Sequence, residues 1–369
     1  MKDHETDIAT LKRAWANKRK SIEPQPVDLA RHATPPPTSG EDKATKHVRQ
    51  MYEQFPYPSP IVGDSLISDL SIMIGLLFPG NELTGWKILD AGCGTGHRML
   101  AMAKDYPQAF VTGLDMTWAS LDVARQLAKK HRATNVELIQ GNLLDLAEGE
   151  RYDLIVSTGV IHHLSDPARG LRNLCRRLSD DGVILLWHYH ALGEFDRLLA
   201  RELILLLSGG ERDSLAEETV LLSEFGFDLS TVRYGTDTST LPSDALSRSS
   251  INADAYLHPI VNTYRFAEAV EMFVGTGLHW AAVNAVNIDG ESKLIALDPD
   301  TVGILPTVTG EGLFDAPRIQ DRYRRLDKME KLRAIELALK PTGFSVIAGR
   351  NNSYRQCEPR IERNRIALQ

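Results

Sequence analysis

The stretch LDAGCGTG, residues 89–96, decides the fold, because glycines alternate there directly after a predicted strand. The strand is the short apolar run from Trp86 to Asp90. The glycines stand at Gly92, Gly94 and Gly96. A turn that lacks side chains at alternate positions allows a ligand to lie directly against its backbone. We therefore expect a nucleotide-like ligand at the carboxyl end of this strand.

The spacing of the glycines predicts which ligand this is. A dinucleotide turn of the G-x-G-x-x-G type needs its third glycine at position 97, which is His97. No lysine of the Walker type follows, which disfavours a nucleoside triphosphate. The spacing D-x-G-x-G-x-G, starting at Asp90, is instead that of loops that bind S-adenosylmethionine. We expect Asp90 to face the cationic amino group of the methionine part.

Composition and charge are those of an ordinary globular chain. Its 369 residues are 43% hydrophobic and 25% charged, and the net charge of −7 provides no general attraction to nucleic acid or to an anionic membrane. The three cysteines show no metal-ligand or disulfide spacing. Neither a signal peptide nor a long apolar run is visible. We expect a cytoplasmic protein that uses no membrane.

Strand and helix signals alternate beyond the glycine loop. The predicted strands are Trp86–Asp90, Ala109–Asp115, Val136–Gln140, Tyr152–Ser157 and Gly182–Trp187, and the predicted helices are Gly92–Lys104 after its turn, Leu121–Lys130 and Pro167–Leu178. Short strands separated by helices predict parallel βαβ units. The fold class is therefore α/β, a doubly wound and mostly parallel sheet with helices on both faces.

Later elements extend this pattern. They are a helix at Phe266–Val274, a strand at Leu278–Val283, one charged helix from Pro317 to Leu339, a strand at Gly343–Arg350 and a frayed tail from Asn351. We divide the chain into a flexible, proline-rich arm (1–45), a lid and leading helix (46–84), the S-adenosylmethionine-binding core (85–195), a helical cap with the last core helix and strand (196–285), and an accessory C-terminal segment (286–369).

Further strand ends offer groups that suit the rest of this ligand. Asp115 closes the second predicted strand, where a carboxylate can accept both ribose hydroxyls. Asn142 follows the third strand and can meet an adenine edge, while Leu143 covers its face. Met116 and Thr158 complete the predicted cofactor-binding set. The joint pattern is far more specific than the glycines alone.

Residues 47–195 resemble the class I S-adenosylmethionine-dependent methyltransferases. Besides LDAGCGTG, the resemblance rests on YDLIVSTGVIHHLSDPARGLRNLCRRLSDDGVILLW (152–187). More narrowly, YEQFPYPSP (52–60), and DAYLHP (254–259) followed by NTYRFAEAVEMF (262–273), resemble bacterial methyltransferases that place a lid before the core and an LHP segment before the last helix. It implies a seven-stranded type of sheet with helical insertions, and methyl transfer from S-adenosylmethionine. It also implies that Tyr52, Phe55 and Tyr57 form a lid. The alternative is that these side chains pack an N-terminal arm on the sheet.

Histidines at two predicted strand ends are the catalytic candidates. His162 and His163 follow the fourth strand, and His163 matches a histidine that recurs in the family. His188 and His190 end the fifth strand on one face. Methyl transfer depends mainly on positioning and needs a base only if the acceptor carries a proton. The imidazoles could supply that base, hold a metal or simply line an uncharged pocket; we expect no metal.

The acceptor is expected to be a small molecule. His258 and Tyr264 could reach the same site at the strand ends from the DAYLHP segment. The basic C-terminal helix could follow a phosphate backbone, but Ile319, Tyr323, Leu326 and Met329 at helical spacing indicate a buried face, which makes nucleic acid an unlikely partner. The alternatives are a non-catalytic or regulatory S-adenosylmethionine-binding module and a protein or nucleic-acid methyltransferase. The sequence does not indicate the oligomeric state.

Overall fold

The computed structural model describes residues 41–58, 62–207, 250, 253–288, 291–298, 307–357 and 359–368. Most of the predicted proline-rich arm and residues 208–249 of the predicted helical cap lie outside these residues. Within them, no helix is both long and apolar enough to cross a membrane.

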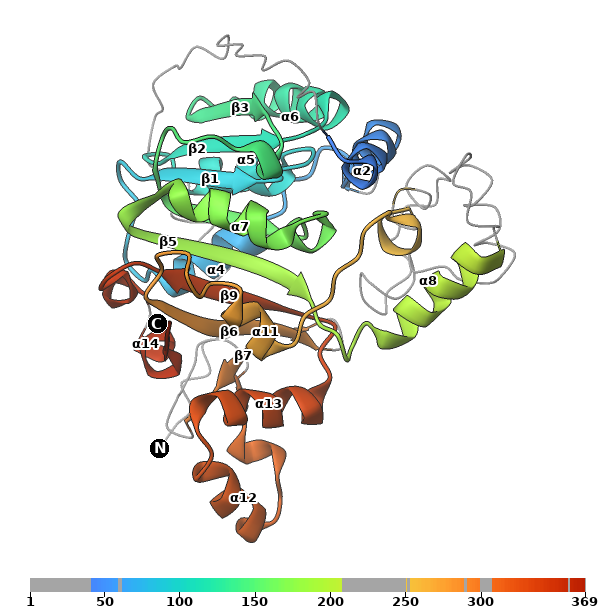
Figure 1. The fold of residues 1–369 in the computed structure, drawn as a ribbon. Helices are drawn as coiled ribbons and strands as arrows, with labels where there is room; N and C mark the ends of the chain where they lie inside the picture. Colours follow the sequence, from blue (N-terminus) through green and yellow to red (C-terminus); the bar gives the residue numbers. More distant parts are fainter. Residues whose placement is uncertain are drawn as a thin grey trace.

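A single sheet of ten strands forms the centre of the molecule (Figure 1). The order is β3-β2-β1-β4-β5-β9-β6-β7-β8, and β10 pairs with β6. The strands are β1 (Lys87–Ala91), β2 (Phe110–Asp115), β3 (Val136–Gln140), β4 (Tyr152–Thr158), β5 (Leu178–Tyr189), β6 (Trp280–Ile288), β7 (Glu291–Ala296), β8 (Thr307–Thr309), β9 (Gly343–Gly349) and β10 (Ile366–Ala367).

The pairing confirms the predicted doubly wound architecture. Strands β1 to β5 pair in parallel, and β9 inserts antiparallel between β5 and β6. The expected seven-stranded part consists of neighbouring strands in the order β3-β2-β1-β4-β5-β9-β6. The strands β7, β8 and β10 extend it. Although 286–369 was predicted as an accessory segment, it supplies a strand to the middle of the sheet. The division into segments otherwise stays a prediction.

Helices cover both faces of the sheet. One buried apolar cluster joins β-strand residues such as Ile88 to α4 (Asp69–Leu77), α5 (His97–Asp105), α6 (Trp118–Lys130) and α14 (Pro359–Asn364). A second joins the neighbouring Leu89 to α7 (Pro167–Arg176), α11 (Phe266–Glu271), α12 (Pro317–Arg324) and α13 (Lys328–Leu339). Successive strand residues point to opposite faces, which explains why adjacent residues enter different clusters.

Two further helices lie at the carboxyl end of the parallel strands. The helix α2 (Lys43–Gln54) lies beside α6, and α8 (Phe195–Leu207) follows β5 (Figure 1). The helix α8 packs against a short π-helical turn, η5 (Ala253–Leu257), which leads into the LHP segment. Short turns η1 (Leu143–Asp145) and η2 (Ile161–His163) follow β3 and β4.

Three predictions for the C-terminal region were wrong. The charged helix expected from Pro317 to Leu339 is broken, because Asp327 caps a new helix by accepting a 2.8 Å hydrogen bond from the Glu330 N–H. Ile319, expected on its buried face, is 47% exposed, whereas Tyr323 is buried as expected. The expected frayed tail is instead packed on the sheet, with Ile361 only 1% exposed.

Candidate cofactor and acceptor site

The glycine loop after β1 is held from the neighbouring strand. The backbone N–H groups of Gly92 and Cys93 donate to the carbonyl of Leu114 at 2.7 and 3.0 Å. The N–H of Gly94 donates to the carboxylate of Asp115 at 2.9 Å. Gly94 has a φ of +53°, and a Cβ there would lie 2.5 Å from the Tyr57 carbonyl oxygen. A side chain is therefore excluded on steric and conformational grounds.

Asp115 lies at the end of β2, as predicted, and its carboxylate is already partly engaged. Besides the Gly94 bond, it accepts from the N–H and the hydroxyl of Thr117 at 2.9 and 2.8 Å. Burial raises the pKa of this carboxyl, while the Thr117 hydrogen bonds oppose the shift. Two carboxylate oxygens offer about four lone-pair positions. The group can therefore hold the loop and still accept a ligand hydroxyl.

Asp90 lies at the end of β1 and is 4% exposed. Burial raises the pKa of this carboxyl to about 7, and the cationic Arg98 only partly offsets the effect. Among the residues that the structure describes, none donates a hydrogen bond to it. An uncompensated buried carboxyl is unfavourable when charged, so a cationic ligand group would stabilise it strongly.

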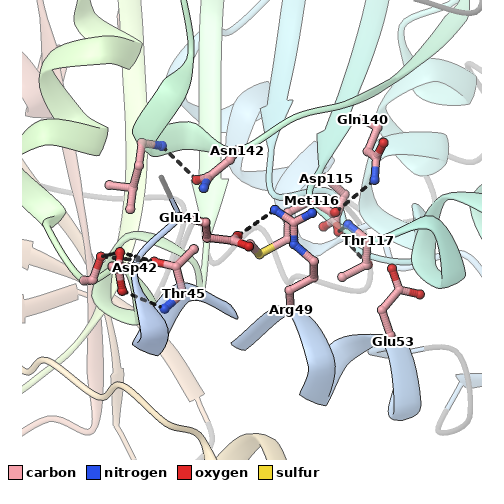
Figure 2. A network of polar contacts seen from close by, with 12 residues as sticks. Glu41, Asp42, Thr45, Arg49, Glu53, Asp115, Met116, Thr117, Gln140 and Asn142 are labelled. Atoms are coloured by element: carbon pink, nitrogen blue, oxygen red, sulfur yellow. Dashed lines mark hydrogen bonds and ion pairs between the residues drawn. The ribbon is translucent and has the colours of Figure 1, made fainter. Parts of the chain in front are cut away.

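The ends of β3 and β4 complete the predicted cofactor set. Asn142 caps η1 by accepting a 2.9 Å hydrogen bond from the Leu144 N–H, and Leu143 is buried. Gln140 donates to the Met116 carbonyl at 3.3 Å. In Figure 2, Asn142 lies on one side of the site, and Asp115 with Met116 lies on the other. Thr158 ends β4 and is partly buried. The structure thus brings the predicted cofactor residues to consecutive strand ends.

The segment predicted as a lid lies at this same edge. Tyr52 donates a 2.7 Å hydrogen bond to Asp254 in η5, and its ring centroid lies 5.6 Å from that of His258. Burial raises the pKa of the Tyr52 hydroxyl well above its usual value, and Asp254 adds to the shift. The Tyr57 carbonyl accepts a 3.1 Å hydrogen bond from the Thr95 N–H. Phe55 is partly buried.

His162 and His188 are both fully buried and face the same region. Their ring centroids are 6.3 Å apart, and Tyr189 lies 4.1 Å from His162. None of the four ring nitrogens has a hydrogen-bond partner in the part of the chain that the structure describes. Burial lowers the pKa of His188 to about 3, and burial together with His163 lowers that of His162 well below its usual value. The pair is therefore neutral and has unused hydrogen-bonding capacity.

The other two candidate histidines are engaged. His163 stacks on His258 with centroids 3.6 Å apart, and its Nδ1 lies 2.7 Å from the Ile260 carbonyl oxygen. Nε2 of His190 lies 3.1 Å from the carboxylate of Glu336 in α13. His190 is therefore engaged by α13, and the ring of His258 lies against His163. Within the described ranges, no three histidine, cysteine or acidic side chains could hold a metal ion.

His97 and α2 add features that the sequence did not reveal. The imidazole of His97 bridges the Thr95 hydroxyl and the Gly63 carbonyl, each at 2.8 Å. The carboxylate of Glu53 accepts from the N–H groups of Trp118 and Ala119, at 2.9 and 3.2 Å. This capping pairs a negative charge with the positive N-terminus of α6. No local pattern marks Glu53, because its partners lie on another element.

Comparison with known proteins agrees with this geometry. Residues 83–209 match the model of a family described as a methyltransferase domain. The chain is 27% identical over 329 residues to an uncharacterised protein of Synechococcus sp., covering 84% of this chain and 73% of that one. It is 37% identical over 110 residues to the ubiquinone biosynthesis O-methyltransferase of Actinobacillus pleuropneumoniae, covering 28% of this chain.

A solved structure shares the wider fold. PKMT2 from Rickettsia typhi, in complex with AdoHcy, superimposes with a TM-score of 0.53 at 20% identity and covers 80% of this chain. The chain spans 55% of that protein and 46% of the Actinobacillus enzyme. Residues 83–209 therefore match a methyltransferase domain, and the glycine loop, Asp90 and Asp115 lie within this range.

Proposed function

We propose that the whole chain is a cytoplasmic methyltransferase that transfers a methyl group from S-adenosylmethionine to a small-molecule acceptor. The observation that carries the proposal is the buried carboxyl of Asp90 beside the glycine loop, because no cationic side chain of the described residues lies at hydrogen-bond distance from it. The α-ammonium group of S-adenosylmethionine would supply one. The likeness of part of the chain to small-molecule O-methyltransferases supports the choice of acceptor class.

The cofactor roles follow the strand ends. Asp90 would bind the ammonium group, and Asp115 would accept the ribose hydroxyls while it holds Gly94 in place. The side chains of Met116 and Leu143 would lie against the adenine, and Asn142 would meet its edge. The amides of the glycine loop would approach the methionine part, while Gly92 and Gly96 let the loop pack against Val160 and Ala124. Thr158 lies where β4 turns toward the acceptor.

The acceptor would meet the methyl group between the ends of β4 and β5. His162 and His188 lie there, with ring nitrogens to which no described residue is hydrogen-bonded. A neutral imidazole with a depressed pKa is a weak base, so these side chains would orient an acceptor atom by hydrogen bonding rather than remove its proton. Tyr52, Phe55 and Tyr57 would close the site from the α2 side. His163 would position the LHP segment through its stacking on His258.

The proposal is tested in two steps on the full chain. Calorimetry should detect binding of S-adenosylhomocysteine and none of NAD, and tight binding of NAD alone would contradict it. Labelled S-adenosylmethionine should then transfer its methyl group to the small-molecule fraction of a bacterial extract. Label in the protein or nucleic-acid fraction would favour a macromolecular acceptor. Cofactor binding without any transfer would favour a non-catalytic module.

A matched pair of variants separates true transfer from background. Asp115→Asn removes a charge from the cofactor site, whereas Asp122→Asn removes one from the exposed surface of α6, where Asp122 pairs with Arg125. Only the first variant should lose transfer of the label. Equal loss in both would attribute the label to a contaminating enzyme or to general damage.

A further inference from the structure

One face of α2 spans the carboxyl edge of the sheet. Thr45, Arg49 and Glu53 are spaced four residues apart and therefore share this face. At one end, the hydroxyls of Thr45 and Ser165 lie 3.1 Å apart, just beyond η2 and β4. At the other end, Glu53 caps α6, just beyond β2, with a 2.9 Å bond to the Trp118 N–H.

This anchoring locates Arg49. The order β2-β1-β4 places β1 between the two anchored ends, so the midpoint of the α2 face lies over the carboxyl end of β1. That end carries the glycine loop. Figure 2 shows the guanidinium of Arg49 between Asn142 and the pair Asp115 and Met116. These are the residues that would surround the adenosyl part of the cofactor.

The guanidinium of Arg49 is held but not fully used. One of its terminal nitrogens lies 2.6 Å from a carboxylate oxygen of Glu41, and this ion pair is partly buried. Its Nε is buried and has no hydrogen-bond partner among residues 41–58 or the other described ranges. A buried N–H without an acceptor costs about 1 to 3 kcal/mol, so a ligand that offers an acceptor or an aromatic face there would be favoured.

The ion pair between Arg49 and Glu41 does not hold α2 against the sheet. Glu41 and Arg49 belong to the same segment, so their contact does not connect α2 to the sheet. The anchoring is carried by Thr45, Glu53 and Tyr52. Glu41 instead fixes the direction in which the guanidinium points. A purely structural role therefore leaves the position of Arg49 unexplained.

We propose that Arg49 is a cofactor-binding residue that contacts the adenosyl part of S-adenosylmethionine, with Glu41 as its positioning residue. The inference rests on the proposed function. A guanidinium is planar, stacks on aromatic faces and carries its charge at every physiological pH, which suits it to cover an adenine ring while Nε–H donates to an oxygen or nitrogen of the nucleoside. The helix α2 then forms the outer wall of the cofactor site.

Calorimetry on the full chain tests this with two probes, S-adenosylhomocysteine and 5′-methylthioadenosine, which lacks the amino-acid part. Arg49→Ala should weaken the binding of both probes by about five- to tenfold, and Glu41→Gln should weaken it by a smaller factor. Arg151→Ala is the matched control, because Arg151 forms an exposed ion pair with Asp180 and lies before β4, away from the carboxyl edge. This control should bind both probes as the unaltered chain does.

Each other outcome has a definite meaning. Unchanged affinity of Arg49→Ala for both probes would overturn the inference, provided that the unaltered chain binds them. If Arg49→Ala lowers the affinity for S-adenosylhomocysteine but not for 5′-methylthioadenosine, Arg49 contacts the amino-acid part. That result would overturn the adenosyl contact. An unaltered chain that binds neither probe would overturn the proposed function itself. A fall in the melting temperature of the ligand-free Arg49→Ala variant, with the Arg151→Ala control unaffected, would assign Arg49 to folding rather than binding.

Discussion

The carboxylate of Asp115 accepts a hydrogen bond from the backbone N–H of Gly94, so the end of β2 shapes the loop that follows β1. The two residues lie on neighbouring parallel strands, and β1 pairs with β2 along its whole length. One side chain therefore orders the loop before any ligand arrives. Preorganisation of this kind reduces the entropy lost on binding.

Replacement of Asp115 should lower the affinity for the cofactor more than it lowers the stability of the fold. Asp115→Asn keeps an oxygen for the Gly94 N–H but loses the charge, so we expect S-adenosylhomocysteine to bind at least about tenfold more weakly, or about 1.4 kcal/mol. Calorimetry measures this, with Asp122→Asn as the surface control. Unchanged affinity would show that the carboxylate serves the loop alone.

Cofactor affinity should depend on the ionisation of Asp90. Because burial raises the pKa of this carboxyl to about 7, it is largely protonated in the ligand-free protein at pH 6, and binding of an ammonium group should release a proton. Affinity should therefore fall as the pH drops below 7. Calorimetry in buffers of different ionisation enthalpy counts the released protons, and Asp90→Asn should release none.

The same pKa shift predicts an effect on stability. The folded protein favours the protonated carboxyl, so this group costs no stability below the unfolded pKa of about 4 and costs progressively more as the pH rises to 7. Ligand-free Asp90→Asn should consequently melt at a higher temperature than the unaltered chain at pH 8 and bind S-adenosylhomocysteine more weakly. A lower melting temperature would indicate that the carboxylate has a stabilising partner.

His188 should act without changing its charge. Since burial lowers its pKa to about 3, the ring stays neutral over roughly pH 5 to 9. Any inflection in the pH dependence of kcat/KM should therefore persist in the His188→Gln variant. We expect His188→Leu to lower kcat/KM about tenfold, by loss of one hydrogen bond, with unchanged affinity for S-adenosylhomocysteine. An inflection near pH 6.5 that depends on His188 would instead identify it as a base.

Glu336 should be important for stability and not for binding. Burial raises the pKa of this carboxyl, but hydrogen bonds from His190 and Arg265 outweigh that effect and lower it. Removal of one partner from such a buried cluster costs about 3 kcal/mol, so Glu336→Ala should unfold at markedly lower denaturant concentration. The ligand affinity of the folded variant should be preserved, and its loss would place this cluster in the cofactor site.

Local patterns were sufficient to predict much of this architecture. The strands that carry Asp90 and Asp115 are short apolar runs that end in an acid, and parallel pairing brings such ends to one edge. The same reasoning located Asn142. It could not predict the partner of His190, because period-two geometry shows which way a side chain points but not that Glu336, on a distant helix, meets it.

The contribution of α2 was also beyond local patterns. Arg49 and Glu53 look like the solvated face of a charged helix. Only the packing of α2 across the strand ends gives Glu53 its partners on α6 and places Arg49 beside Asp115 and Met116. Conversely, the charge pattern after Pro317 predicted one continuous helix, since the break depends on the cap formed by Asp327. Tertiary contacts and caps thus account for the differences.

The antiparallel strand β9 has a consequence for how the protein is made. It pairs with β5 on one side and β6 on the other, yet it comes from residues 343–349. Until the ribosome has released Gly349, the outer edge of β5 has no partner, and an open apolar edge can capture strands of other chains. The cofactor loop is synthesised before residue 100, but the strand that covers the edge of β5 follows only at residues 343–349.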